Sequence, residues 1–125
     1  MKVLIVEDNA NFSRVLKDTL QTLFPLMVIR EAHEGNQALQ QIEAFLPELI
    51  FMDIKLPGEN GLQLTQRIKA SHPDTKIIIL TNYDLLEYRE AAIRSGATSF
   101  LTKDSLDWEH LESLVKSLLE PVSKP

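Results

Sequence analysis

The sequence lacks cysteine, an excess of positive charge and any long hydrophobic run. Without cysteine there can be no disulfide framework, thiolate metal site or redox dithiol. Lysine and arginine together number 13 against 18 aspartates and glutamates, which gives a net charge of −5. Nonspecific affinity for nucleic acids comes mainly from basic side chains that neutralise phosphates. We therefore expect that any DNA binding would come from a separate domain.

Apolar runs in this sequence are short. None approaches the roughly 20 residues that a membrane-spanning helix needs. The run at residues 3–6 ends directly at Glu7 and Asp8, which makes it too short for the apolar part of a signal peptide, and no small-residue cleavage site follows. The sequence is therefore interpreted as cytoplasmic, with no membrane partner.

Short apolar runs alternate with longer stretches of helical periodicity. The runs are rich in branched residues and cover residues 3–6, 27–29, 49–52, 77–80 and 100–101. Strand and helix alternating five times predict an α/β fold, a single doubly wound parallel sheet of five strands with helices on both faces. The second and fifth runs are the least apolar, as edge strands would be.

The whole length of 125 residues suits one domain. We place that domain at residues 1–120, followed by a proline-containing tail or linker start at residues 121–125. Apolar residues at helical spacing in the stretches between the strands are expected to face the sheet. They are Phe12, Val15, Leu16, Leu20 and Leu23, then Ala38, Leu39, Ile42 and Phe45, then Leu64 and Ile68, then Leu85, Leu86 and Ala92, and finally Leu111, Leu114, Val115, Leu118 and Leu119.

Chemically useful side chains follow four of the predicted strands. Glu7 and Asp8 follow the first strand, Asp53 the third, Thr81 the fourth and Lys103 the fifth. In an open parallel sheet, sites form at the carboxyl ends of the strands, beside the point where the strand order reverses. If the order is 2-1-3-4-5, these side chains meet at one edge.

Three close carboxylates predict a site for Mg²⁺, which takes few carboxylates and leaves room for water and phosphate oxygens. Beside such an ion Asp53 is a candidate nucleophile, because carboxylates attack phosphoryl groups to form aspartyl phosphates. Lys103 would neutralise charge on the transferring phosphoryl group, and Thr81 would donate a hydrogen bond to one of its oxygens.

Each of these residues also has an ordinary structural interpretation. Glu7 and Asp8 could cap the following helix. Asp53 could simply end a strand, Thr81 could be a turn residue and Lys103 a solvated surface residue. Their joint placement after four strands favours the functional interpretation.

The same residues stand in longer motifs: Val6-Glu7-Asp8-Asn9, Asp53-Ile54-Lys55-Leu56-Pro57-Gly58 with Gly61-Leu62, Ile79-Leu80-Thr81, and Gly96-Ala97 through Phe100-Leu101-Thr102-Lys103. With these motifs, residues 2–120 resemble the receiver domain of two-component response regulators, which has a flavodoxin-like fold with strand order 2-1-3-4-5. The run from Phe100 to Ser105, with Ser71 to Thr75, is similar to the NarL/FixJ (LuxR-type) group. Members of that group usually carry a C-terminal helix-turn-helix domain that binds DNA.

The resemblance implies a role for each matching residue. Asp53 would be the phosphoacceptor, with Thr81 and Lys103 contacting the phosphoryl group and Phe100 acting as the aromatic switch residue. The implied contributors to the Mg²⁺ site are Glu7, Asp8, Asp53 and the backbone carbonyl of Ile54. In the family, phosphorylation draws the threonine inward and the aromatic ring follows, which changes the face formed by the fourth helix, fifth strand and fifth helix.

The resemblance also implies partners. The phosphoryl group would come from a sensor histidine kinase, phosphorylation would favour a homodimer, and transcription would be controlled through a DNA-binding domain. The protein would be a switch, not an enzyme, and would catalyse only its own phosphotransfer and dephosphorylation.

Several positions in and around the predicted site depart from the commonest family pattern or vary within it. Three of them, Lys55, Asn82 and Tyr83, would form the rim of the site. Glu7 stands in place of an aspartate, and Asn82 replaces a smaller residue, so the route to Asp53 is narrower. Lys55 and Tyr83 lie two residues past Asp53 and Thr81. They are either solvated rim residues or, as a hypothesis, flank the path of attacking water and tune the lifetime of the aspartyl phosphate.

Three other functions remain open. A small phosphatase with an aspartyl nucleophile would carry a second aspartate two residues later, where this sequence has Lys55. A flavodoxin-like binding module would need a phosphate-binding loop after the first strand, where Glu7, Asp8 and Asn9 stand instead. A stand-alone or degenerate receiver would act only as an interaction module.

Overall fold

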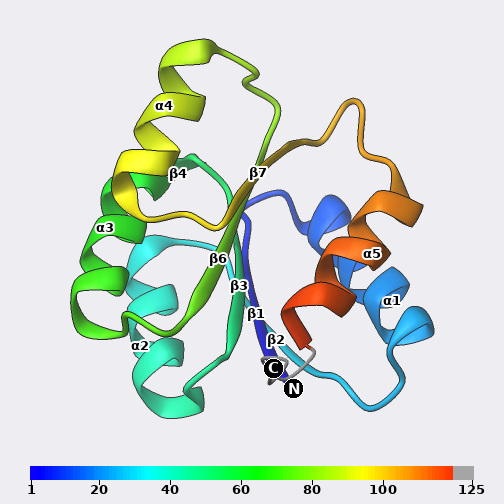
Figure 1. Cartoon of the computed structure of the whole chain (residues 1–125). Coiled ribbons are helices and arrows are strands. Elements are labelled where there is room, and N and C mark those ends of the chain that lie inside the picture. Colours follow the sequence, from blue (N-terminus) through cyan, green and yellow to red (C-terminus); the bar gives the residue numbers. More distant parts are fainter. Residues whose placement is uncertain (120–125) are drawn as a thin grey trace, which may run out of the picture.

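Five parallel strands form the central sheet of the computed structural model, which describes residues 1–119 (Figure 1). The strands are β1 (Lys2–Val6), β2 (Val28–Ala32), β3 (Leu49–Met52), β6 (Lys76–Thr81) and β7 (Ser99–Thr102). Their order is β2-β1-β3-β6-β7, and every neighbouring pair is parallel. The predicted order 2-1-3-4-5 is confirmed, and the two least apolar runs form the edge strands.

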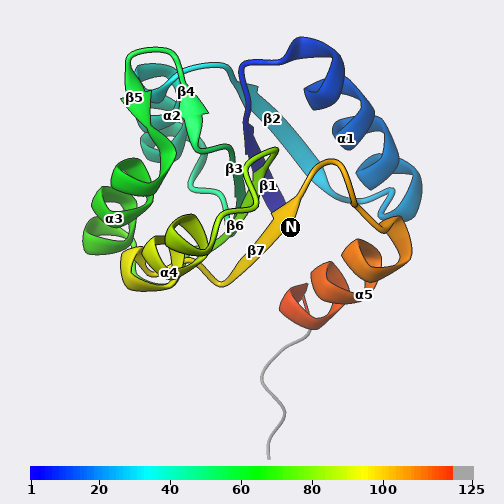
Figure 2. The same ribbon diagram turned by 90° about the horizontal axis from the view of Figure 1, so that it is seen from above.

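Five helices cover the two faces of this sheet. They are α1 (Ala10–Leu23), α2 (Gly35–Phe45), α3 (Gly61–Ser71), α4 (Leu86–Ser95) and α5 (Trp108–Leu119). Helices α1 and α5 lie on one face, and α2, α3 and α4 lie on the other (Figure 2). The predicted doubly wound α/β architecture is confirmed.

Alternation along the strands produces two apolar cores. In β1, Leu4 and Val6 pack toward α2, α3 and α4, whereas Val3 and Ile5 pack toward α1 and α5. The central strands are buried on both faces, which explains why their sequences are continuously apolar.

A small hairpin follows β3 and was not predicted. Its strands β4 (Lys55–Leu56) and β5 (Glu59–Asn60) pair antiparallel. Gly58 occupies the turn with φ +71°, a left-handed conformation that glycine adopts without strain. Strands of two residues carry no readable periodicity, so no local pattern in the sequence predicts them.

The predicted apolar faces are wrong at three residues. Leu85 and Leu86 are 47% and 67% exposed, and Val15 is 51% exposed. Leu85 precedes α4 as its N-cap, and the buried residue of that helix is Ala92 in its second half, so the first turn projects beyond the core. Val15 directly precedes the buried Leu16, and adjacent helical residues point in different directions.

The predicted tail at residues 121–125, together with residue 120, lies outside the described residues. Among the helices described within residues 1–119, none has the length and apolar character needed to cross a membrane.

Candidate functional site

The predicted site residues meet at the carboxyl edge of the sheet. The Lys103 ammonium, which follows β7, forms an ion pair with Glu7 after β1 and lies 3.1 Å from Asp53 Oδ2 after β3. The other carboxylate oxygen of Asp53, Oδ1, accepts a hydrogen bond from the Ile54 N–H at 2.7 Å. Three strands that are distant in the sequence therefore supply one charged cluster.

Three carboxylates of this cluster are placed to hold a cation. One oxygen from each of Glu7, Asp8 and Asp53 can be chosen so that all lie within 4.8 Å of one another. Glu7 and Asp53 are 3% and 6% exposed, whereas Asp8 is exposed, so one side of the cluster is open to solvent. Oxygen donors with an open side fit Mg²⁺, which keeps several waters when bound to proteins.

Burial and charge change the proton affinities of the cluster. Burial is the main cause that raises the pKa of Glu7 from 4.5 to about 7, and the nearby Asp53 charge adds to it, while Lys103 and the Asn9 N–H oppose it. Burial acts against the charged form of Lys103 as well, but its contacts with Glu7 and Asp53 outweigh burial and raise its pKa. Lys103 therefore remains a cation at neutral pH.

Helix capping after β1 is performed by Asn9. Its side-chain Oδ1 accepts a hydrogen bond from the Phe12 N–H at 3.1 Å. Glu7 instead turns back toward the cluster, where its Oε2 accepts from the Asn9 N–H at 3.0 Å. The alternative interpretation of Glu7 as the helix cap is therefore wrong.

Thr81 connects two strand ends. Its side chain is fully buried, and its Oγ1 accepts a hydrogen bond from the Tyr83 N–H at 3.3 Å. Its carbonyl oxygen accepts from the Lys103 N–H at 2.8 Å. A shift of the Thr81 backbone would therefore act directly on Lys103, the residue that contacts Asp53.

Phe100 is half-buried on β7 and packs against the core beneath α2, α3 and α4. The guanidinium carbon of Arg89, on α4, lies 4.8 Å from the centroid of the Phe100 ring. The predicted switch residue therefore lies between the sheet and a cationic side chain.

Ile54 is fully buried, and its carbonyl oxygen accepts a hydrogen bond from the Gly61 N–H at 2.7 Å. One lone pair of that oxygen is thus already used, and its predicted role at the metal stays a prediction.

Gly61 is needed here for a close approach, since a Cβ at this position would lie 1.8 Å from the carbonyl oxygen of Asp53.

The predicted rim residues lie at the surface beside the cluster. Asn82 and Tyr83 are exposed. The Lys55 ammonium lies 5.0 Å from the centroid of the Tyr83 ring, which also makes an edge-to-face contact with Tyr88 at 6.2 Å. Lys55 from the hairpin and Tyr83 from the loop after β6 therefore touch each other.

Sequence reasoning missed one contact of Lys103. The ammonium lies 4.8 Å from the centroid of the Phe12 ring, on α1. Phe12 was assigned to the apolar face of its helix, and no sequence signal distinguishes a core phenylalanine from one that also contacts a cation.

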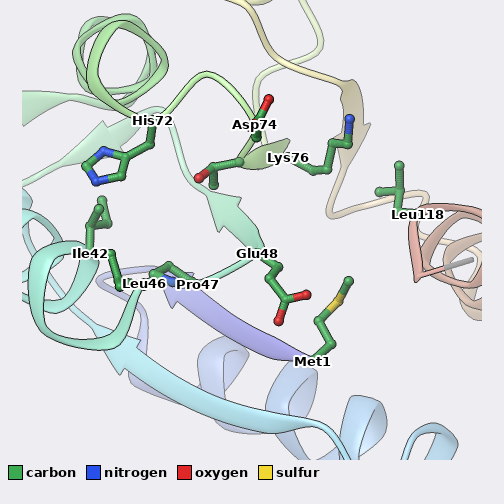
Figure 3. Close-up of a pocket in the computed structure, with 10 residues that line it drawn as sticks. Met1, Ile42, Leu46, Pro47, Glu48, His72, Asp74, Lys76 and Leu118 are labelled. Carbon is green, nitrogen blue, oxygen red and sulfur yellow. The ribbon is translucent and has the colours of Figure 1, made fainter. Parts of the chain in front are cut away.

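A hollow of about 370 Å³ lies at the opposite edge of the sheet, shown in Figure 3. Glu48 and Lys76 line it, just before and at the start of their strands, together with Met1 and His72. Because the charged cluster follows the strands' carboxyl ends, this hollow belongs to another part of the molecule.

Relatives of the chain share both its sequence and its fold. It is 36% identical over 119 residues to the oxygen regulatory protein NreC of Staphylococcus carnosus (strain TM300), covering 94% of this chain and 54% of that protein. The signal receiver domain of a DNA binding response regulator from Colwellia psychrerythraea 34H superimposes with a TM-score of 0.92 at 25% identity, covering 97% of this chain and 99% of that one. A BeF3 activated DrrB receiver domain gives a TM-score of 0.85 at 28% identity, covering 96% and 97%.

The chain spans about half the length of the curated relatives it matches. The family model described as the response regulator receiver domain matches residues 3–116. That match covers most of the sequence and agrees with the strand order and with the edge where the acidic cluster lies. The resemblance read from the motifs is confirmed, and the chain belongs to the response regulator receiver domain family.

Proposed function

We propose that Asp53 is the phosphoacceptor of this receiver domain and that a sensor histidine kinase is the donor. The observation that carries this proposal is the placement of the buried Asp53 carboxylate 3.1 Å from Lys103 and beside Glu7 and Asp8. A nucleophile in a phosphoryl transfer needs neighbouring positive charge, because negative charge spreads over the transferred oxygens.

The transfer step uses one oxygen of Asp53. That oxygen forms a bond to phosphorus while the bond between phosphorus and the donor's imidazole nitrogen breaks. The nitrogen keeps the electron pair. Hydrolysis reverses the attachment: a water oxygen attacks phosphorus, the bond to Asp53 breaks, and the carboxylate and inorganic phosphate are released with a proton.

The surrounding residues position the group. Glu7, Asp8, Asp53 and the Ile54 carbonyl would hold Mg²⁺, which when bound supplies positive charge to the phosphoryl oxygens. Lys103 would exchange part of its contact with the carboxylates for a phosphoryl oxygen. Thr81 would turn its hydroxyl away from the Tyr83 N–H and toward another phosphoryl oxygen. The Phe100 ring would then move inward after Thr81.

The output of the switch is proposed from the relatives. A DNA-binding domain in the same protein would respond to the changed face of α4, β7 and α5, and so control transcription. A homodimer formed on phosphorylation is one way in which that face would act, and cytoplasmic placement follows from a kinase donor and a DNA output.

The phosphoacceptor assignment is tested with Mg²⁺ and acetyl phosphate, measuring the intact mass of the protein. One phosphoryl group should be added per chain, only with Mg²⁺, and not to the Asp53→Asn variant. Repeated turnover of a phosphate ester would favour the phosphatase alternative instead. If no phosphoryl group is added, the domain is a degenerate receiver.

The rim residues are proposed to control how long the phosphoryl group persists. Lys55 and Tyr83 touch each other beside the cluster, so removal of either side chain should widen the path of attacking water. We expect Lys55→Ala and Tyr83→Ala to speed loss of phosphate about two- to fivefold, the effect of a contact worth roughly 0.5–1 kcal/mol. Asn82→Ala should act in the same direction. Unchanged rates in all three variants would assign these residues to the solvated rim.

A further inference from the structure

We propose that Arg89 is a latch that holds the switch residue Phe100 in its half-buried position and ties it to the loop after Thr81. This inference rests on the proposed function, because it concerns how the proposed switch is held before phosphorylation. Arg89 is a positioning residue, not a catalytic one, since it does not touch the acidic cluster.

Two contacts of Arg89 carry the proposal. The guanidinium carbon lies 4.8 Å from the centroid of the Phe100 ring, and its Nε donates a hydrogen bond to Asp84 Oδ1 at 2.6 Å. Asp84 lies three residues after Thr81, in the loop that leads into α4. One side chain therefore joins the two segments whose movements must be coupled in a switch.

The electrostatics of the pair keep this bridge formed. The hydrogen bond from Arg89 is the main cause that lowers the pKa of the Asp84 carboxyl, and the same contact raises the pKa of the guanidinium. Each group therefore favours the charged form of the other. A planar guanidinium can donate to a carboxylate and stack on an aromatic ring at the same time.

The surface around Phe100 shows what the latch separates. A hollow of about 310 Å³ lies between α4 and β7, and a second of about 170 Å³ lies between β7 and α5. Among the residues that the structure describes, Arg89 and Phe100 are the two that line both hollows. The contact between Arg89 and Phe100 therefore separates these two hollows. Strand β7 runs between α4 and α5 (Figure 2).

The start of α4 is held by Tyr88, which packs against the core and contacts the Tyr83 ring, and by the Asp84–Arg89 contact. Its N-cap residue, Leu85, offers no side-chain hydrogen bond, and Leu86 in the first turn is exposed. The Asp84–Arg89 contact spans that first turn. Withdrawal of Phe100 would remove the stacking partner of Arg89, and so loosen the start of α4 together with the loop after Thr81.

If the latch favours the unphosphorylated arrangement, its removal must ease the switch, since a ligand shifts a two-state equilibrium by its differential affinity for the two states. The test uses the phosphoryl analogue beryllofluoride at saturating Mg²⁺. Protein labelled with 4-fluorophenylalanine at its five phenylalanines gives ¹⁹F signals. The Phe100 signal is assigned by its loss in the Phe100→Leu variant, and its change with beryllofluoride gives the concentration for half-conversion.

Arg89→Ala should lower the half-converting concentration about two- to fivefold, the range set by one exposed cation–π contact. Asp84→Asn should lower it less, because Arg89 would still stack on Phe100. The half-converting concentration of Arg89→Lys should lie between those of the parent and of Arg89→Ala. The matched control is Arg94→Ala, which removes an exposed arginine from the same helix and should leave the concentration unchanged.

An unchanged or higher half-converting concentration in Arg89→Ala would overturn the latch, as would an equal effect of Arg94→Ala. Failure of the proposed function has a different signature. In that case the parent would not respond to beryllofluoride, or Asp53→Asn would respond as well as the parent does.

Discussion

At the scale of single residues, the site places charge where it costs stability. Glu7 and Asp53 are nearly inaccessible to solvent, and one lysine, Lys103, faces both. Burying a charge is unfavourable unless pairing and hydrogen bonds compensate it. Here two buried carboxylates share one ammonium, and the exposed Asp8 adds further negative charge. This arrangement supports the proposal that the cluster receives a cation and a phosphoryl group.

The raised pKa of Glu7 leads to a prediction about stability and pH. The folded domain holds the Glu7 proton up to pH about 7, whereas the unfolded chain loses it near 4.5. The contribution of Glu7 to stability is therefore fully present below pH 4.5 and lost as the pH rises through 7. Without Mg²⁺, the free energy of unfolding of the parent relative to Glu7→Gln should fall between pH 5 and pH 8, by on the order of 2–3 kcal/mol.

Urea unfolding of both proteins across that pH range measures the difference. Comparison with the glutamine variant cancels the titration of all other groups. A difference that stays constant, or that rises with pH, would mean that Glu7 is already ionised in the folded domain.

At the scale of elements, we infer that the ends of β6 and β7 connect the site to the surface. The Thr81 carbonyl accepts from the Lys103 N–H, and the two strands pair in register from Ile78 to Thr81. A change from mostly inactive to mostly active needs roughly 5.5 kcal/mol of differential stabilisation. One hydrogen bond to a charged group supplies about 1.5–3 kcal/mol. In the proposed switch, a hydrogen bond from Thr81 alone would therefore be too weak, and a contact of Lys103 with the phosphoryl group would have to contribute as well.

Thr81→Ala separates phosphorylation from response. The variant keeps Asp53, Lys103 and the acidic cluster, so it should still accept a phosphoryl group from acetyl phosphate. Its Phe100 ¹⁹F signal should respond only weakly, since the hydroxyl that is proposed to draw the ring inward is gone. Thr81→Ser keeps that hydroxyl and is the matched control. A full response in Thr81→Ala would refute the coupling.

At the scale of the whole molecule, the sheet brings distant residues to one edge, and a ligand there stabilises every element that supplies a contact. Mg²⁺ that binds the folded domain but not the unfolded chain should raise the free energy of unfolding, by about 2.7 kcal/mol at a hundred times its dissociation constant. Asp8→Asn leaves the buried core untouched and should weaken this effect, and a chelator should abolish it. Equal stabilisation of Asp8→Asn and the parent, measured by urea unfolding at increasing Mg²⁺, would place the ion elsewhere.

The sequence predicted the parallel sheet because short apolar runs alternate with stretches of helical periodicity, and the resemblance to receiver domains implied the strand order. It did not predict the hairpin at Lys55–Asn60, whose strands are too short for a period. It also placed Leu85 and Leu86 in the core, because helical spacing says nothing about how far a helix extends past the sheet. The contacts of Lys103 with Phe12 and of Arg89 with Phe100 depend on packing between helices and strands, which no local pattern encodes.

The most direct measurement locates the phosphoryl group itself. The domain is incubated with Mg²⁺ and acetyl phosphate, the acyl phosphate is reduced with borohydride, and the peptides are sequenced by mass spectrometry. We predict homoserine at position 53 and at no other aspartate, and none when Mg²⁺ is withheld. Reduction at a different aspartate, or at none in the presence of Mg²⁺, would contradict the assignment of Asp53 as the phosphoacceptor.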